Sequence, residues 1–439
     1  MSPQNDPGAR QSDVPGTGVT LEQWLGYLES IHPSEIDLGL DRVLLVLRRL
    51  FRRNPSARII TVGGTNGKGS AVAALEQLLI RAGRATGAYT SPHLQQYNER
   101  VRINGSNVTD ESLVRAFERV EAARGNTTLT YFEFGTLAAF VLFEDAGVDD
   151  WVLEVGLGGR LDAVNVLDPN LAIITSVDID HVSFLGDNRE VIGFEKAGIL
   201  RPGINAIYAD IDPPASVLQQ VSAQKVHLER PGDTYELAPF EDSGNTTGSG
   251  FTLKQARYGD EVRLPDTGLP VHSLAAAVVA IRELEPGLEL AAIEQVLARL
   301  TLPGRYEVLR SSPQVIADVG HNPHAAAWLA NRISSQRPSA GRVIAVYAAL
   351  TDKDVEGVAG AMAKVVDRWH LAGLQVPRGL GCQELAGRLR ACIGEESTEL
   401  SSSVGQALEK ALAEAARGDL VIVFGSFYTV AAAREALGK

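Results

Sequence analysis

The chain has 439 residues, more than one hydrophobic core usually organises, so we expect two or three domains. Its hydrophobic fraction of 45% and charged fraction of 22% are those of a soluble globular protein, and no signal peptide or transmembrane run is found, which predicts a cytoplasmic protein without a membrane partner. The net charge of -13 argues against a nucleic-acid partner but not against anionic small ligands, because a local cluster of cations overrides the overall field.

The first 50 residues predict a tail and two helices. Residues 1–18 are rich in Pro, Gly, Ser, Asp and Gln and lack apolar periodicity, so a disordered tail is predicted. Helical spacing begins at Leu21, with Trp24 and Leu28 on one face, and a second helix is predicted over residues 36–51. The polar stretch between the helices either forms the wall of a pocket or only connects them.

A glycine-rich turn follows the β-branched run of residues 59–62 and leads into an apolar helix. Glycines let backbone N–H groups approach an anion, the helix N-terminus adds a partial positive charge, and Lys68 adds a full one. The strict P-loop pattern is not met, because Val62 stands at its first glycine and Gly69 separates Lys68 from Ser70. The order of elements still predicts a nucleotide site, with the Ser70 hydroxyl placed for a magnesium ion. Its residues are Gly64, Thr65, Asn66, Gly67, Lys68, Gly69 and Ser70.

Two strands then bring polar groups to the edge where open α/β sheets bind ligands. The strand over residues 85–90 ends in Ser91, and after helices over 109–124 and 130–147 the strand over 151–155 carries Glu154. An acid inside an apolar strand needs a compensating charge. Magnesium supplies that charge in nucleotide-binding sheets, and the alternative is an ion pair between Glu154 and Arg160.

The third strand, over residues 171–177, is followed by two acids and a histidine. Asp178, Asp180 and His181 at this strand end favour a metal site beside Glu154. By local pattern alone, Lys196 lies at the end of a surface helix. Residues 201–268 predict short strands with an antiparallel patch and a Gly/Ser/Thr loop over 241–250, and helices follow over 272–284 and 290–300.

Residues 302–305 interrupt the helical pattern, and this interruption predicts a domain boundary. We therefore expect a tail over 1–18, an ATP-binding domain over 19–300 and a C-terminal domain over 301–439. Alternating strands and helices predict that the last part is a smaller doubly wound α/β domain. Its strands are expected over residues 314–318, 342–347, 367–371 and 419–424. Cys382 and Cys392 are interpreted as ordinary thiols, although one disulfide between them stays open.

Taken together and in order, these motifs resemble the folylpolyglutamate synthase and dihydrofolate synthase family of the Mur ligase superfamily. The resemblance runs from Leu21 to the C-terminus, and the stretch at residues 129–133 looks most like the bifunctional bacterial enzymes. It implies an α/β fold: a P-loop-containing, Mur-ligase-type central domain with a mostly parallel sheet, plus a smaller Rossmann-like C-terminal α/β domain. The motifs lie at residues 36–40, 64–70, 91–94, 131–133, 154–162, 180–181, 195–199, 303–305, 318–323 and 352–354.

The resemblance implies an ATP-dependent ligase with two Mg²⁺ ions. ATP would phosphorylate a carboxylate, and the amine of L-glutamate would attack the acyl phosphate. The implied substrates are dihydropteroate, reduced folates and L-glutamate, and the implied state is a monomer. Alternatives are a monofunctional folylpolyglutamate synthase, another Mur-type amide ligase such as one with a muramyl-peptide substrate, or a nucleotide-binding regulator without turnover.

Residue roles are also implied by the resemblance only. Ser91, Glu154 and His181 would hold magnesium, with Ser70 near the phosphates, and Lys68 would steady the transferring phosphoryl group. Lys196 would be a carbamylated lysine that supplies a further metal ligand. Arg305 and Asp318 would reach ATP across the cleft, and His321 would lie at the interface as a catalytic group. The residues expected to line the pterin site are Ile36, Thr130, Phe132, Asp162 and Ala163.

Three positions depart from the family pattern. Val164 stands where the family usually has Thr, and Gly320 where it usually has Ala before His321. Ser273 stands where the family has an Asn that contacts the nucleotide. Serine is shorter and offers one donor, so nucleotide affinity or base preference could differ, unless His272 compensates.

Overall fold

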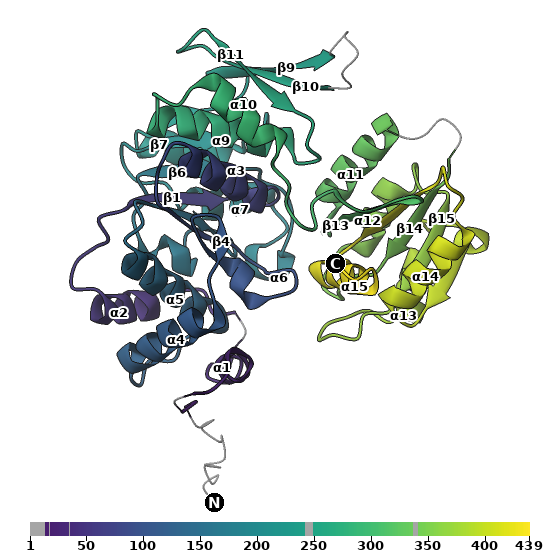
Figure 1. Cartoon of the computed structure of the whole chain (residues 1–439), viewed down its shortest axis with the longest axis horizontal. Helices are drawn as coiled ribbons and strands as arrows, with labels where there is room; N and C mark the ends of the chain where they lie inside the picture. The colour runs from purple at the N-terminus through teal and green to yellow at the C-terminus, as the bar shows by residue number, and fades with distance from the viewer. Residues whose placement is uncertain (1–13, 17, 35, 242–248, 337–340) are drawn as a thin grey trace, which may run out of the picture.

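The computed structural model describes residues 14–16, 18–34, 36–241, 249–336 and 341–439, and Figure 1 shows them as two bodies joined near the middle of the view. The predicted tail over 1–18 and the Gly/Ser/Thr loop over 241–250 fall largely outside the described residues. Among the described helices, none has the length and apolar character needed to cross a membrane. We call residues 19–300 the larger domain and residues 301–439 the smaller domain.

An eight-stranded sheet forms the centre of the larger domain, in the order β4-β3-β2-β5-β1-β6-β7-β8. The six strands from β2 to β8 in this order are parallel, and β3 and β4 add antiparallel pairs at one edge. The strands are β1 Arg58–Gly63, β2 Thr86–Tyr89, β3 Val101–Ile103, β4 Ser106–Asn107, β5 Asp150–Glu154, β6 Leu171–Ile174, β7 Asn205–Tyr208 and β8 His227–Glu229. The prediction of a mostly parallel sheet is confirmed.

Helices cover both faces of this sheet, because successive side chains of a buried strand point to opposite sides. Trp151 and Leu153 face one apolar core, and Val152 between them faces the other. The first core contains α1 Leu21–Leu28, α2 Asp41–Leu50, α4 Asp110–Arg124 and α5 Tyr131–Ala146. The second contains α3 Lys68–Arg81, α9 Val271–Leu284 and α10 Leu290–Ala298, which Figure 1 shows side by side.

The remaining elements of the larger domain flank different parts of this sheet. The helical ones are η1 Tyr97–Arg100, η2 Ala163–Val166, α6 Val182–Leu185, α7 Arg189–Ala197 and α8 Ala215–Ala223. A separate antiparallel sheet contains β9 Tyr235–Glu241, β10 Ser249–Gln255 and β11 Glu261–Pro265. The predicted antiparallel patch is therefore confirmed.

The smaller domain is a six-stranded sheet in the order β12-β13-β17-β14-β15-β16, parallel except for β12. Its strands are β12 Glu307–Ser311, β13 Gln314–Asp318, β14 Val343–Tyr347, β15 Arg368–Ala372, β16 Thr398–Ser401 and β17 Leu420–Phe424. Its helices are α11 Pro323–Gln336, α12 Val355–Met362, α13 Cys382–Leu389, η3 Glu395–Ser397, α14 Val404–Glu414 and α15 Phe427–Ala436. Both cysteines are free thiols, so the disulfide alternative is wrong.

Some predicted boundaries were wrong. The second helix begins at Asp41 and not at Ile36, because the Arg42 guanidinium binds the side chain and the carbonyl of Asp37 and folds residues 36–40 back on the first turn. The strand predicted over 171–177 ends at Ile174, and its polar residues lie in an extended loop. Edge strands β3, β4, β12 and β16 were not predicted, because short or half-exposed strands carry little apolar pattern.

The loop after β2 links the two domains. Leu94 packs against the core beside α14 and α15 of the smaller domain, although it belongs to the larger one. Next to it, the Gln95 side chain accepts a hydrogen bond from Arg434 at 2.9 Å and donates one to the carbonyl of Lys439 at 3.1 Å. The loop that begins at Ser91 therefore lies where the domains meet.

The amino ends of the central strands of the main sheet are stabilised by a buried carboxylate. Asp150 begins β5, is 0% exposed, and accepts hydrogen bonds from Arg58 of β1 and from Arg84 just before β2. Arg58 also pairs with Glu285 at 2.6 Å, at the end of α9. These contacts tie three neighbouring segments together at the end of the sheet away from the ligand-binding edge.

Asp150→Ala is therefore expected to lower the stability of the larger domain by about 3 kcal/mol, because it removes the buried carboxylate between two half-buried arginines and leaves them only Glu285 as a shared partner. A shift of the denaturant midpoint measures this loss. The control is Asp145→Ala, which removes an exposed pair with Arg119. Equal midpoints for the two variants would contradict the structural role of Asp150.

Candidate active site

One cavity of about 690 Å³ opens between the domains at the carboxyl ends of β1, β5 and β6. It is lined by every residue predicted for nucleotide binding and catalysis, and by the predicted metal-binding residues except Asp178. These lining residues are Gly64, Thr65, Asn66, Gly67, Lys68, Gly69, Ser70, Ser91, Glu154, His181, Lys196, Ser273, Arg305, Asp318 and His321.

The phosphate loop has the shape that an anion cradle requires. Gly64 and Gly67 have positive φ values of 140° and 82°, and a Cβ on Gly64 would lie 1.9 Å from the Thr175 hydroxyl. Only glycine fits both positions. The Lys68 ammonium donates to the carbonyls of Gly64 and Thr65 at 3.1 and 3.2 Å, so its charge lies over the loop. The predicted strand, loop and helix are confirmed as a structural unit.

Beside this loop, the donors present fit a divalent cation. The Ser70 hydroxyl is buried and has no hydrogen-bond partner among the described residues. Glu154 is 5% exposed, and burial raises the pKa of its carboxyl, while Lys68, the Ser91 backbone N–H at 3.2 Å and Arg305 lower it. Carboxylate and hydroxyl oxygens that converge in a buried place are typical magnesium ligands.

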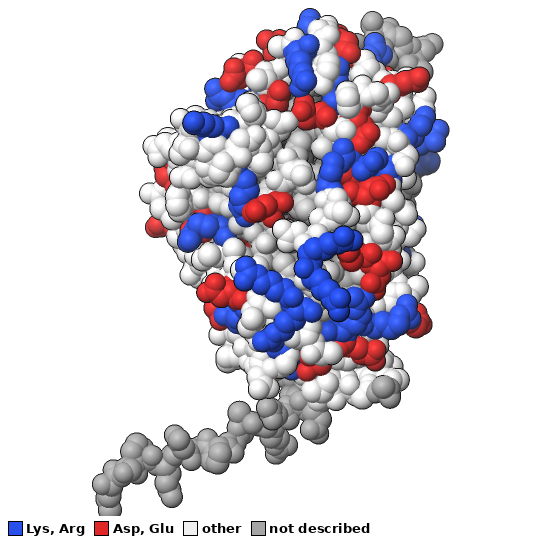
Figure 2. All heavy atoms as spheres, turned by 90° about the vertical axis from the view of Figure 1, so that its left-hand side faces the viewer, with Lys and Arg blue, Asp and Glu red and all other residues white. Residues whose placement is uncertain are grey.

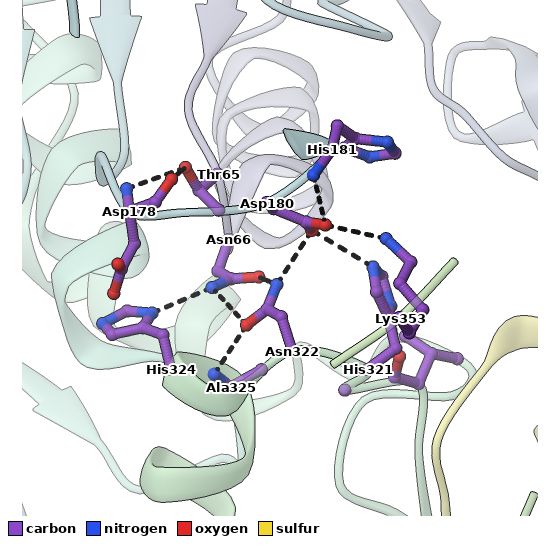
Figure 3. Close-up of polar contacts among 12 residues, drawn as sticks. Thr65, Asn66, Asp178, Asp180, His181, His321, Asn322, His324, Ala325 and Lys353 are labelled. Atoms are coloured by element: carbon purple, nitrogen blue, oxygen red, sulfur yellow. Dashed lines mark hydrogen bonds and ion pairs between the residues drawn. The ribbon is translucent and has the colours of Figure 1, made fainter. Parts of the chain in front are cut away.

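The imidazole of His181 is in the form that binds metals. His181 is exposed at the cavity wall, but partial loss of water around the ring, together with Lys353 and Lys68, lowers its pKa to about 4, against the raising effect of Asp180. It is therefore neutral near pH 7, with a ring nitrogen lone pair free to ligate. Its backbone is left-handed, with φ of 53°, and the ring points away from the neighbouring polar network (Figure 3).

Lys196 is buried and not at a surface helix end, so the interpretation from its local pattern is wrong. The side chain is 4% exposed and its ammonium donates to the carbonyl of Gly64 at 2.8 Å. Burial, and next the charge of Lys68, lower its pKa to about 7. The amine is thus partly neutral and nucleophilic near neutral pH, within the phosphate cradle.

The smaller domain contributes a cation, Arg305, and an anion, Asp318, to the same cavity. Burial lowers the pKa of Arg305, and the nearby Asp318 and Glu154 raise it. The Asp318 carboxyl, whose pKa is raised by burial and lowered by Arg305, accepts the N–H groups of Tyr306 and Gly320 at 2.9 and 2.8 Å. Arg305 also lies 5.0 Å from the Phe427 ring centroid.

Ser273 lies against the phosphate loop, where a residue that contacts the nucleotide is expected. Its hydroxyl is 2.3 Å from the place that a Cβ on Gly67 would take, and the residue is 3% exposed. The adjacent His272 also lines the cavity, and its Nδ1 has no partner within the described chain. Burial lowers the pKa of His272, so the ring is neutral and can accept or donate one hydrogen bond.

The residues predicted for the pterin site lie outside this cavity, on the other side of residues 156–158. The Phe132 ring packs on Gly156, where a Cβ would lie 2.6 Å away, and on Tyr89 at 6.0 Å between centroids. Thr130 caps α5 and Ile36 is half-buried. The other two, Asp162 and Ala163, are 2% and 4% exposed.

Asp162 is fixed by the backbone. Its two oxygens accept the N–H groups of Leu157 at 2.9 Å and Val164 at 3.0 Å, and burial raises its pKa to about 6. Leu157 itself lines the main cavity. Asp162 therefore orders the loop that separates the two sites. Val164, one of the departures from the family pattern, is fully buried in the apolar core.

A polar clasp between the domains was not predicted. Asp180 accepts from the Lys353 ammonium at 2.7 Å and from the Asn322 amide at 3.0 Å, and its carboxylate lies 3.5 Å from the His321 ring (Figure 3). Burial raises the pKa of Asp180, but His321 and Lys353 outweigh it and hold that pKa well below its usual value. We call Asp180, Lys353, Asn322 and Asn66 the clasp.

The clasp includes a reciprocal amide pair. Asn66 of the phosphate loop donates to the Asn322 side chain at 3.2 Å and accepts from it at 3.0 Å, and it also contacts His324 at 2.8 Å (Figure 3). The smaller domain is thereby bound directly to the phosphate loop. The sequence offered one signal for it: polar residues at the ends of strands of both domains.

Two interpretations from the sequence need correction. Asp180 serves the clasp through both oxygens, and the Asp178 carboxylate accepts the N–H of Ile179, so these acids do not join His181 as a ligand group. The alternative ion pair between Glu154 and Arg160 is also wrong, because Arg160 pairs with Glu195 at 2.8 Å.

On the face of the larger domain in Figure 2, basic side chains are interspersed with acidic ones.

Two protein-family models match the chain: the Mur ligase middle domain over residues 62–232, and the Mur ligase glutamate ligase domain over residues 304–427. The dihydrofolate synthase/folylpolyglutamate synthase of Escherichia coli (strain K12) is 41% identical over 426 residues, which cover 97% of this chain and 97% of the relative. The protein of the same name from Bacillus subtilis (strain 168) is 30% identical over 414 residues, covering 91% and 95%.

Solved structures of proteins with related names are similar to this chain over nearly its whole length. E. coli FolC in complex with DHPP and ADP is similar with a TM-score of 0.90 and 39% identity, covering 97% of this chain and 99% of that one. The bifunctional folylpolyglutamate synthase/dihydrofolate synthase from Yersinia pestis, complexed with AMPPNP and Mn ion, has a TM-score of 0.89 and 40% identity, covering 97% and 100%.

The clasp predicts that Lys353→Met opens the cleft. The side chains of Lys353 and Asp180 are only 9% and 10% exposed. Removal of the ammonium therefore leaves a buried carboxylate without its positively charged partner, which destabilises the closed arrangement of the domains by about 3 kcal/mol. Separation of the domains returns Asp180 to water, and small-angle scattering should show a larger radius of gyration. The control is Arg390→Met, in an exposed pair with Glu395. An unchanged radius for Lys353→Met would contradict the clasp.

Proposed function

The chain belongs to the Mur ligase family, and we propose that within this family it works as a bifunctional dihydrofolate synthase/folylpolyglutamate synthase. It is an ATP-dependent ligase that uses a divalent metal ion. The proposed reactions join the amine of L-glutamate to the carboxyl of 7,8-dihydropteroate, which forms dihydrofolate, and to the γ-carboxyl at the end of a folate tail. In both, ATP first converts the carboxyl to an acyl phosphate, and the amine then displaces phosphate.

One observation carries the proposal: a single cavity unites a phosphate loop, buried acids and a half-buried arginine from both sides of the domain boundary. The first step must bring a carboxylate to a triphosphate, and both are anions. Cations and oriented N–H groups in a site with little water overcome this repulsion. Lys68, Arg305 and the N-terminus of α3 supply positive charge around the place where phosphate would bind.

The roles of the metal-binding side chains are part of the proposal. Ser70, Ser91, Glu154 and His181 would hold the ions, since they offer hydroxyl, carboxylate and neutral imidazole donors around the phosphate loop. Bound magnesium supplies charge neutralisation and polarises the phosphoryl oxygens. Lys68 would steady the phosphoryl group in transfer, and Arg305, Asp318 and Ser273 would position the rest of the nucleotide.

Lys196 is proposed to act as a carbamate. A neutral amine reacts with carbon dioxide, and a pKa of about 7 leaves much of this amine neutral at physiological pH. The product is an anion where an ammonium would otherwise face Lys68, so carbamylation replaces a repulsion with an attraction. The carbamate oxygens would add a ligand for the second metal ion.

The acceptor carboxyl would arrive from the pterin site, where Phe132 offers an aromatic face and Asp162 a carboxylate to a flat, hydrogen-bonding heterocycle. Thr130, Ile36 and Ala163 would complete its walls. His321, at the interface and 3.5 Å from Asp180, would assist the amine step. Closure of the clasp keeps water from the acyl phosphate, which it would otherwise hydrolyse.

The remaining proposals concern partners. We infer a monomer, a cytoplasmic location and no nucleic-acid partner. The overall charge of -13 supports the last of these, and so do the mixed charges on the face in Figure 2.

The test is an acceptor panel. Purified protein is incubated with ATP, magnesium and L-glutamate plus either dihydropteroate, tetrahydrofolate or a UDP-muramyl acceptor, and mass spectrometry counts added glutamates. Extension of dihydropteroate and of tetrahydrofolate supports the proposal. Extension of only one of them favours a monofunctional ligase, and extension of the UDP-muramyl acceptor favours another Mur-type ligase. No phosphate release above background favours a regulator.

Lys196→Ala should lower kcat by about 100-fold or more while nucleotide affinity stays nearly unchanged, since the side chain acts on the transferring group and not on the base or ribose. Short carboxylic acids should restore part of the rate. In ¹³C-bicarbonate, the unsubstituted protein should give a carbamate signal that grows as the pH rises through the pKa of about 7, because the amine loses its proton there.

The matched control is Glu195→Gln, which alters the neighbouring residue and its pair with Arg160. It should keep most of the turnover and the whole carbamate signal. Full turnover by Lys196→Ala would remove the carbamate from the proposal and leave the ligase activity to be judged by the acceptor panel.

A further inference from the structure

A second cavity, of about 650 Å³, lies on the other side of the phosphate-loop helix. It shares Gly69, Ser91, Glu154 and Arg305 with the main cavity, so the two meet at the proposed metal site. Its walls are α3, the β3–β4 hairpin, the end of α10 and the start of α15. We call it the α3 groove. None of the residue roles proposed above requires a cavity that extends along α3.

The groove runs along one stripe of α3. Gly69, Ala73, Gln77 and Arg81 all line it, and positions four apart lie above one another on a helix. Gly69 and Arg81 are twelve residues apart, which corresponds to about 18 Å at 1.5 Å per residue. The groove therefore extends from the site of phosphoryl transfer to the far end of the helix, much further than a free amino acid needs.

Most charged groups in the groove are already paired. Arg102 binds Glu76 at 2.8 Å, Arg434 binds Glu307, and Glu99 accepts three backbone N–H groups of residues 94–96. Arg81 and Arg299 differ. Both are exposed, and neither has an ion-pair partner within the part of the chain that the structure describes.

These two arginines lie at different depths. Arg299 is three residues before Leu302, whose side chain is 3.9 Å from a Cβ placed on Gly69. The Cα of Arg299 therefore lies within about 11 Å of the Cα of Leu302, which borders the inner end. Arg81 lies at the outer end, about 18 Å away. In a protein of net charge -13, a groove with two unpaired arginines is a local site for an anion with charges spread along its length.

We propose that the α3 groove binds the γ-glutamyl tail of folate acceptors, with Arg299 and then Arg81 pairing with successive α-carboxylates of the tail. The proposal rests on the proposed function and names the path of its longer substrates. A γ-linked glutamyl unit adds five backbone bonds, or about 6 Å when extended, and one α-carboxylate. Arg299 thus faces the first or second carboxylate behind the reacting residue, and Arg81 the third.

This path explains how one transfer site accepts acceptors of different length. Dihydropteroate has no tail, so it reaches the transfer site without entering the groove. A polyglutamylated folate must present its last carboxyl at the same place while its tail lies elsewhere. The groove offers that place because it opens at Glu154 and Ser91. Arginine suits the tail because its planar guanidinium pairs with carboxylates in a bidentate way.

The experiment measures kcat/KM of the full-length protein with dihydropteroate, tetrahydrofolyl diglutamate and tetrahydrofolyl tetraglutamate. Arg299→Gln should lower the value about threefold to fivefold for both folate acceptors, and Arg81→Gln only for the tetraglutamate, as expected for exposed charge pairs. Dihydropteroate should be unaffected by either change. The losses should shrink at high salt, because exposed pairs are screened. The matched control is Arg48→Gln, in the exposed last turn of α2.

Two results would overturn the tail site. One is a protein that extends all three acceptors with both variants matching Arg48→Gln. The other is an increased KM for L-glutamate with every acceptor, which would assign the groove to the incoming amino acid. A protein that extends no acceptor contradicts the proposed function itself, and the two failures are therefore distinguishable.

Discussion

A buried carboxylate determines how the active site is assembled. Glu154 ends the central strand β5, and its charge is partly compensated by Lys68 from α3, by Arg305 from the smaller domain, and by the Ser91 N–H from the loop after β2. No single element supplies enough compensation. Because an uncompensated charge in a dry site is unfavourable, the three segments must come together around β5, and the place where they meet is ready for another anion and its metal ion.

The sequence was sufficient to predict an element correctly where its local pattern agrees with its place in the tertiary structure. The β-branched run before Gly64, the apolar α3 and the alternating strands after residue 301 each fill a buried position that their composition already favours. The ordered motifs then gave the family, and with it residues that lie in one cavity. Glu154 could be singled out without any relative, because an acid in an apolar strand requires a physical reason.

Other features depend on contacts that a linear pattern does not contain. Lys196 has the sequence surroundings of a surface helix end, and only the packing of α7 against the phosphate loop buries it. Asp180 looked like a metal ligand until the smaller domain placed Lys353 beside it. Arg42 moved the start of α2 by binding Asp37. In each case, the partner is distant in the chain or competes with helix propensity.

The short loop after β2 has a thermodynamic consequence. Ser91 lines the cavity between the domains, and only three residues later the half-buried Leu94 packs against the apolar core of the other domain. A chain segment this short cannot absorb much displacement, so rotation of the smaller domain must pull on Ser91, which is one of the proposed metal ligands. If Ser91 binds the ion as proposed, ion binding and the angle between the domains would be linked, and by reciprocity a change that favours one would favour a particular value of the other.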